Sequence, residues 1–133
     1  MFLNALSNED KPKFLDLLYI VAQSDGVIEE CEISHISAYA GEMGIENNYN
    51  VSESLENIIN YFKSRPETIR KIVIAEVLAL AHIDGKFCSA EKIIIKNMGK
   101  EFSLPEYFIN EILEWVNIIQ PLYAKGFQLV GLV

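Results

Sequence analysis

The chain has 133 residues, the length of one domain, and half of them are apolar, so there is ample material for a core. Nineteen acidic and eleven basic residues give a net charge of −8, and the basic residues are scattered along the chain. This balance argues against a nucleic-acid groove, which needs clustered Lys and Arg, and suits cations or a basic partner surface instead.

The cysteine content and hydropathy indicate the cellular compartment. Cys31 and Cys88 are too few for a disulfide framework, and the first residues lack the basic region of a signal peptide. The longest apolar run, residues 72–81, contains Glu76 and is too short to span a bilayer. We therefore expect a reduced, cytoplasmic protein that does not span a membrane.

The first half of the chain predicts three helices, because apolar residues recur there at helical spacing. Asn8 and Ser52 are candidate N-caps of the first and third helices. Asp25-Gly26 ends the first helix with a turn, and Gly44 stops the second. We expect these helices at about residues 9–24, 30–43 and 52–64.

The second half predicts three more helices. One opens at Pro66, one follows Ser89 as its N-cap, and one opens at Pro105. The helix from Pro66 is apolar almost all round, which predicts a buried central helix. It ends at a second Asp-Gly pair, Asp84-Gly85.

The two halves match when the sequence is shifted by 59 residues. Both Asp-Gly turns then coincide without a gap, and identical residues also pair at other positions: Ala22 with Ala81, Glu32 with Glu91, Ile36 with Ile95, and Glu42 with Glu101. This self-similarity favours an internal duplication. We predict a single all-α domain over residues 1–133, a bundle of about six helices with halves at about 9–64 and 66–120.

The C-terminal segment, residues 121–133, is hydrophobic without a clear helical period. A segment of this kind is sticky when it is left in water. We expect it to pack back on the bundle or onto a partner.

The repeated element is an Asp-Gly pair followed by a glutamate seven residues after the aspartate, and it has two interpretations. In the first, glycine supplies the positive φ of a tight turn, and the glutamate meets the positive end of the following helix. In the second, carboxylates of the two repeats converge on a divalent cation, Ca²⁺ or Mg²⁺ rather than Zn²⁺. The four candidate ligands are Asp25, Glu32, Asp84 and Glu91. An EF-hand is excluded, because apolar residues and Lys86 occupy the positions where its acids would lie.

These residues also carry a family resemblance. The patterns Ala22-x-x-Asp25-Gly26-x-Ile28-x-x-x-Glu32 and Ala81-x-x-Asp84-Gly85-x-Phe87-x-x-x-Glu91 resemble the TerB-like (tellurite-resistance) family. The resemblance covers about residues 14–116 and leaves the C-terminal segment outside. It implies a duplicated all-α bundle, a cytoplasmic role near stress-response or membrane-associated complexes, and metal-binding acids. No enzymatic activity comes with it.

Lys86 departs from an acidic loop in the second copy and places a cation beside Asp84, so the two halves are not expected to bind metal equally. The functional prediction is a non-enzymatic TerB-like domain that binds a divalent cation through its acidic turns. The alternative is a metal-free protein-interaction module that docks through its acidic face or its hydrophobic C-terminal segment. A protein partner is expected under both, and an oligomer is compatible with either.

Three other kinds of residue have open interpretations. Glu76, alone in an apolar helix, can face the acidic centre, reach solvent or pair with a lysine. His35 and His82 belong to no zinc motif and are expected to be ordinary helix residues. Cys31 and Cys88 both follow an Asp-Gly turn but lie at non-equivalent repeat positions, which argues against a redox pair.

Overall fold

The computed structural model describes residues 1–47, 51–83 and 88–132. In these ranges every regular element is helical, so the all-α prediction is confirmed. A short 3-10 helix, η1 (Leu3–Ala5), precedes the α-helices. These are α1 (Asp10–Ala22), α2 (Glu30–Met43), α3 (Leu55–Lys63), α4 (Glu67–Ala81), α5 (Ser89–Glu101) and α6 (Glu106–Leu129).

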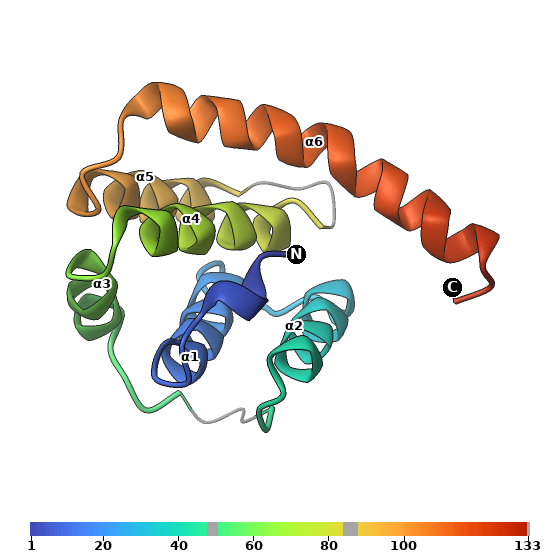
Figure 1. Cartoon of the computed structure of the whole chain (residues 1–133), viewed down its shortest axis with the longest axis horizontal. Coiled ribbons are helices and arrows are strands. Elements are labelled where there is room, and N and C mark those ends of the chain that lie inside the picture. The colour runs from blue at the N-terminus through green and yellow to red at the C-terminus, as the bar shows by residue number, and fades with distance from the viewer. Residues whose placement is uncertain (48–50, 84–87, 133) are drawn as a thin grey trace.

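Helix α4 lies at the centre of the fold, as its all-round apolar sequence predicts. It contacts α1, α2, α3, α5 and α6, and Figure 1 shows it between α6 on one side and the α1–α2 pair on the other. Its buried residues include Val73, Ile74, Val77 and Leu80. A helix with so little polar surface is stable in water only when other helices cover it.

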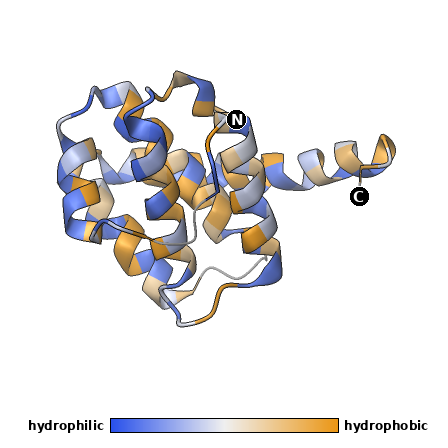
Figure 2. Ribbon diagram, turned by 90° about the horizontal axis from the view of Figure 1, so that it is seen from below, coloured by the Kyte–Doolittle hydropathy of each residue, from blue (hydrophilic) through white to orange (hydrophobic). Residues whose placement is uncertain are grey.

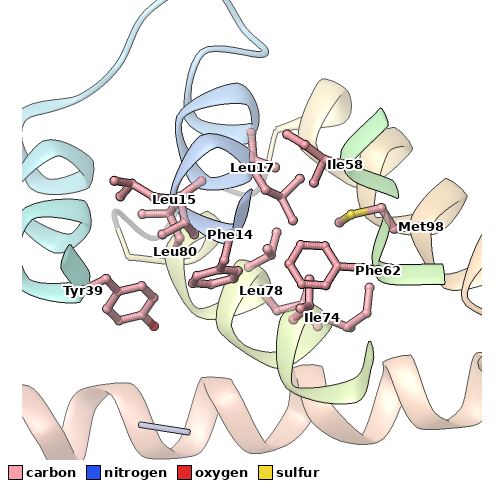
Figure 3. Packing of buried hydrophobic residues seen from close by; sticks show 14 of the residues in the cluster. Phe14, Leu15, Leu17, Tyr39, Ile58, Phe62, Ile74, Leu78, Leu80 and Met98 are labelled. Atoms are coloured by element: carbon pink, nitrogen blue, oxygen red, sulfur yellow. The ribbon is translucent and has the colours of Figure 1, made fainter. Parts of the chain in front are cut away.

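The core forms where α1, α3, α4 and α5 meet. Figure 3 shows the side chains that fill this space, among them Phe14, Leu17, Ile58, Phe62, Ile74, Leu78 and Met98, and all of these are at most 1% exposed. Each such side chain contributes about 1.5–3 kcal/mol when it is fully buried. This core holds the bundle together.

The helices begin at capping residues that differ in part from the predicted ones. In α1 the Ser7 N–H donates to Asp10 Oδ2 at 2.9 Å and the Asp10 N–H donates to Ser7 Oγ at 3.1 Å, which is a capping box in place of an Asn8 cap. Helix α3 starts from Ser54 instead of Ser52, and α5 starts from Cys88 instead of Ser89. The pairing of an acceptor with the amide three residues later selects the start of each helix.

The repeat register is visible in the helix boundaries. Helices α1 and α4 end at the matched residues Ala22 and Ala81, and the matched Ile36 and Ile95 are both buried. Not every apolar residue of α5 is buried, and Ile93 is 69% exposed. Only one face of α5 meets the bundle, and Ile95 and Met98 occupy that face.

The C-terminal segment is helical for most of its length, contrary to the expectation that it lacks a helical period. Helix α6 continues through Pro121 to Leu129, and residues 121–132 are all exposed instead of packed back on the bundle. Proline removes one helical N–H bond, but the helix resumes beyond it. Figure 1 shows α6 crossing the bundle and then extending past its edge. We call residues 118–132 the overhang.

Candidate functional site

The first Asp-Gly turn has a local structural role. Asp25 is exposed, and its Oδ1 accepts a hydrogen bond from the Val27 N–H at 3.1 Å. Gly26 follows with φ of 93°, a conformation that favours glycine. The second turn, Asp84-Gly85 with Lys86, lies outside the described residues. The position of Asp84, one of the four predicted ligands, is therefore not described.

Glu32 and Glu91 occupy equivalent positions in the two halves and have the same structural role. Each is 5% exposed and is the third residue of its helix. Glu32 Oε1 accepts from the Glu29 N–H at 3.0 Å, and Glu91 Oε1 accepts from the Cys88 N–H at 3.4 Å. Both glutamates thus close a capping box with the residue that begins the helix.

The described residues do not bring a cation site together. Across 1–47, 51–83 and 88–132, no three His, Cys, Asp or Glu side chains are grouped so that they could hold a metal ion. Asp25 is turned to solvent, while Glu32 and Glu91 are buried at helix starts. A four-carboxylate arrangement would require Asp84, whose position is not described.

Glu76 is buried in α4, where it pairs with the amino terminus of the chain and not with solvent or a lysine. It is 3% exposed, and its Oε1 lies 3.0 Å from the amino group of Met1 and accepts from the Phe2 N–H at 2.9 Å. The Tyr39 hydroxyl also bonds it, and burial together with this carboxylate raises the pKa of Tyr39. Glu76 therefore joins α2 and α4 to the start of the chain.

His35 lies next to this cluster, with its ring 4.4 Å from that of Tyr39 between centroids. Burial lowers the pKa of His35 to about 4, although the nearby Glu76 carboxylate acts in the opposite direction. The imidazole is therefore neutral at pH 7. The sequence predicts that His35 is an ordinary helix residue and gives no sign of this lowered pKa.

Asp10 forms a second buried charge cluster, which the sequence interpretation missed. It is fully buried and accepts from Arg65 Nε at 2.9 Å, Arg65 Nη2 at 3.0 Å and the Tyr61 hydroxyl at 2.6 Å. Burial alone would raise the pKa of Asp10, but these bonds and that from Ser7 hold it below its ordinary value. The spacing of Ser7 and Asp10 signals the capping box, whereas nothing local signals Arg65.

The overhang is the largest exposed apolar feature among the described residues. Seven large side chains in it are 45–76% exposed: Ile118, Leu122, Tyr123, Phe127, Leu129, Val130 and Leu132. Figure 2 shows this end of α6 projecting from the body. One side of it forms a hollow of about 390 Å³ between the helix and the turn that follows it.

The end of the overhang is a defined helix stop. Gly131 has φ of 77°, and the Leu132 N–H donates back to the Phe127 carbonyl at 2.9 Å. This is the pattern of a Schellman cap, which satisfies carbonyls that would otherwise lack partners. The overhang therefore ends as a helix through its own sequence, although the bundle leaves residues 121–132 exposed.

No helix in the described ranges combines the length and apolar character needed to cross a bilayer. Helix α6 is long enough, but Pro121, Lys125 and several amide side chains interrupt its apolar surface.

Comparison with known proteins adds evidence on the fold. Neither protein-family models nor curated protein sequences match this chain. A solved structure of a tellurite resistance protein from Nostoc punctiforme PCC 73102 superposes with a TM-score of 0.68 and 19% sequence identity. The superposition covers 94% of this chain and 82% of that one. At this identity the likeness establishes the fold alone, and the chain therefore has the fold of a tellurite resistance protein, as its paired Asp-Gly motifs predict.

Proposed function

We propose that this chain is a non-enzymatic protein-interaction domain that docks partners through the overhang of α6. The observation that carries the proposal is the contrast within one helix. The first part of α6 packs on α4, whereas the overhang leaves Leu122, Phe127 and Leu129 at 45–76% exposure. Exposed apolar surface of this extent marks interaction sites in soluble proteins.

The polar interior supports a non-enzymatic role. Asp10 is engaged by Arg65 and Tyr61, and Glu76 by the Met1 amino group and Tyr39. Groups with perturbed pKa values are candidates for catalysis when they line a cleft, but here they join helices inside the body. Their roles are structural. We place the protein in a reducing cytoplasm, because two cysteines are too few for a disulfide framework.

Charge reversal in the overhang tests the docking proposal. The double variant Leu122→Glu/Phe127→Glu places two carboxylates on its surface without touching the core. Ile93→Glu on α5 is the matched control, because Ile93 is an apolar side chain of similar exposure at 69%. Partners identified by mass spectrometry after pull-down should be retained by the wild type and by Ile93→Glu, and lost by the double variant. Retention by all three proteins would refute docking through the overhang.

A divalent cation is the second candidate ligand, and this function would connect the chain to stress responses such as the tellurite resistance named for its structural neighbour. The observation in its favour is that Glu32 and Glu91 are buried carboxylates at matched repeat positions. Buried charges in proteins are usually paired or coordinate a metal ion. Asp25 and Asp84 would complete the ligand set, with Ca²⁺ or Mg²⁺ preferred over Zn²⁺.

Calorimetric titration with Ca²⁺, Mg²⁺, Mn²⁺ and Zn²⁺ tests this second candidate. Binding heat should vanish in Asp25→Asn/Asp84→Asn and persist in Glu30→Gln, an exposed acid of the same region. Glu32 and Glu91 are left unchanged in this test, because their capping bonds would confound the result. An absence of heat in the wild-type protein up to millimolar metal would eliminate the cation function and leave the docking proposal intact.

A further inference from the structure

We propose that the occupant of the overhang is the overhang of a second copy of this chain, paired antiparallel about a two-fold axis. This rests on the proposed function, because it names the partner of the same surface. Four features of the overhang carry the inference: the spacing of its apolar residues, its exposed area, its charge and its central glycine.

The apolar residues on one side of the overhang recur every three or four positions, which is the seam spacing of paired helices. They line the 390 Å³ hollow together with Leu132: Ile119, Leu122, Tyr123, Gly126, Phe127 and Val130. The Tyr123 and Phe127 rings lie 6.4 Å apart between centroids. The stripe also continues the face through which Val116 is buried in the bundle. A surface with this period fits another helix better than an extended peptide.

The exposed area matches what a dimer requires. Side chains of this size offer on the order of 150–200 Å², so those of the overhang, at 45–76% exposure, offer roughly 100 Å² each. Five of the seven lie on the stripe and together present on the order of 500 Å² per copy, or about 1,000 Å² in a pair, which is the lower limit for a specific interface. Pairing of two overhangs along this stripe therefore covers these five side chains.

The charge distribution selects the antiparallel orientation. The chain has a net charge of −8, yet Lys125 is the one Lys, Arg, Asp or Glu in residues 118–132. The overhang is therefore the part where two copies approach with the least repulsion. Antiparallel pairing sets the two acidic bodies at opposite ends of the paired helices and opposes the helix dipoles. Parallel pairing would bring the bodies side by side.

Gly126 lies near the middle of the stripe. A Cβ built at this position meets no atom within 4 Å, so the backbone is open to a neighbouring helix. A two-fold axis near the middle of the stripe places this residue opposite its own copy. Residues toward the end of the overhang, such as Leu132, then lie far from their own copies.

Sedimentation equilibrium of the full chain, from low micromolar concentration upward, tests the pairing. The wild type and Ile93→Glu should show a monomer–dimer equilibrium. The double variant Leu122→Glu/Phe127→Glu should weaken dimerisation by about a hundredfold or more, because it places four carboxylates in one apolar seam. Circular dichroism checks that all three proteins fold alike, which is expected since the altered side chains are exposed.

Disulfide formation tests the orientation. In a Cys31→Ser/Cys88→Ser background, Gly126→Cys should form a covalent dimer on mild oxidation, and Leu132→Cys should not. Efficient linking through both positions would indicate parallel pairing and overturn the antiparallel assignment. Linking through neither position, with a monomeric protein in sedimentation, would overturn the second copy as occupant.

The outcomes separate this inference from the docking proposal. A wild type that stays monomeric and sediments with vesicles of phosphatidylcholine and phosphatidylglycerol would replace the second copy by a lipid surface. A monomeric wild type that retains identified partners only with an intact overhang would overturn the pairing and support docking. A dimer that persists in the double variant would place the interface elsewhere and overturn the pairing.

Discussion

Two regions of this molecule reverse the usual placement of side chains, in opposite senses. The body buries the carboxylates of Asp10, Glu32, Glu76 and Glu91, whereas the overhang exposes large apolar side chains. In the body each buried carboxylate accepts hydrogen bonds from donors of the same chain. In the overhang Gln120 donates to the Ala79 carbonyl of α4, but residues 121–132 are all exposed.

This difference distinguishes buried charges that have a structural role from exposed apolar side chains that suggest a binding surface. A buried carboxylate with several donors loses little by burial, and it fixes the positions of the elements that supply those donors. An exposed apolar helix is stabilised when another molecule covers it, which is the role that we propose for a second copy of the chain. The body therefore encodes the fold, and the overhang carries the proposed association.

The largest effect is expected at Asp10. Replacement by alanine leaves the Tyr61 hydroxyl and the Ser7 N–H without their acceptor and the Arg65 guanidinium without its counter-charge. We expect Asp10→Ala to lower the free energy of unfolding by about 3–5 kcal/mol in urea denaturation. The adjacent exposed acid is the control, and Glu9→Ala should change stability by less than about 0.5 kcal/mol. Equal effects of the two variants would refute a structural role for the buried carboxylate.

A smaller effect is expected from the titration of His35. The folded protein holds the pKa of His35 at about 4, below its ordinary value of 6.5, so the unfolded chain takes up the proton first as pH falls. The stabilisation is complete above about pH 6.5, is lost progressively as pH falls toward 4, and changes no further below that. The loss is on the order of 3 kcal/mol.

Comparison of His35→Phe with the wild type isolates this titration. Phenylalanine keeps a ring against Tyr39 but cannot be protonated. The difference between the unfolding free energies of the two proteins should change between pH 7 and pH 4. A difference that is constant over this range would show that the imidazole is accessible to protons in the folded state.

Most helices of the body can be predicted from the sequence, but the side-chain contacts that join them cannot. Helical period, the turn at Gly26 and the all-round apolar character of α4 are local signals, and they identify the helices and the central one. The pairing of Asp10 with Arg65, 55 residues away, depends on tertiary packing that no local pattern reports. The contact of Glu76 with the Met1 amino group likewise joins residues that are far apart in the sequence.

The helical structure of the overhang is difficult to predict from the sequence for a different reason. Apolar residues there occupy more than one side of the helix, so the contrast between faces that reveals a helical period is weak. Pro121 and Gly126 also suggest breaks, because both disfavour helix interiors. Gly131 is a local signal for a helix end, and it is consistent with the helix that the structure shows.

The two repeats differ at the first residue of their capping boxes, which predicts a stabilising substitution. Cys88 begins α5, and its thiol accepts from the Glu91 N–H at a long 3.4 Å, since sulfur is a weak acceptor. A hydroxyl is among the preferred N-cap groups, so Cys88→Ser should raise the free energy of unfolding by roughly 0.5–1 kcal/mol. Cys31→Ser is the control, because Cys31 is exposed, and it should change stability by less than about 0.5 kcal/mol. A destabilised Cys88→Ser protein would indicate that packing around the sulfur outweighs the cap.

The smallest effect on the folding of the monomer is expected in the overhang, and it completes the contrast with the body. Leu129 is 76% exposed, so its folded and unfolded environments are similar and little transfer free energy is lost on substitution. Leu129→Gln should change the unfolding free energy by less than about 0.5 kcal/mol, measured at a concentration where the protein is monomeric. Leu78→Ala in α4 removes a side chain that is 1% exposed and should cost about 2–5 kcal/mol. A destabilisation of the monomer by Leu129→Gln close to that of Leu78→Ala would show that the overhang packs on its own chain. The overhang would then need no other molecule to cover it.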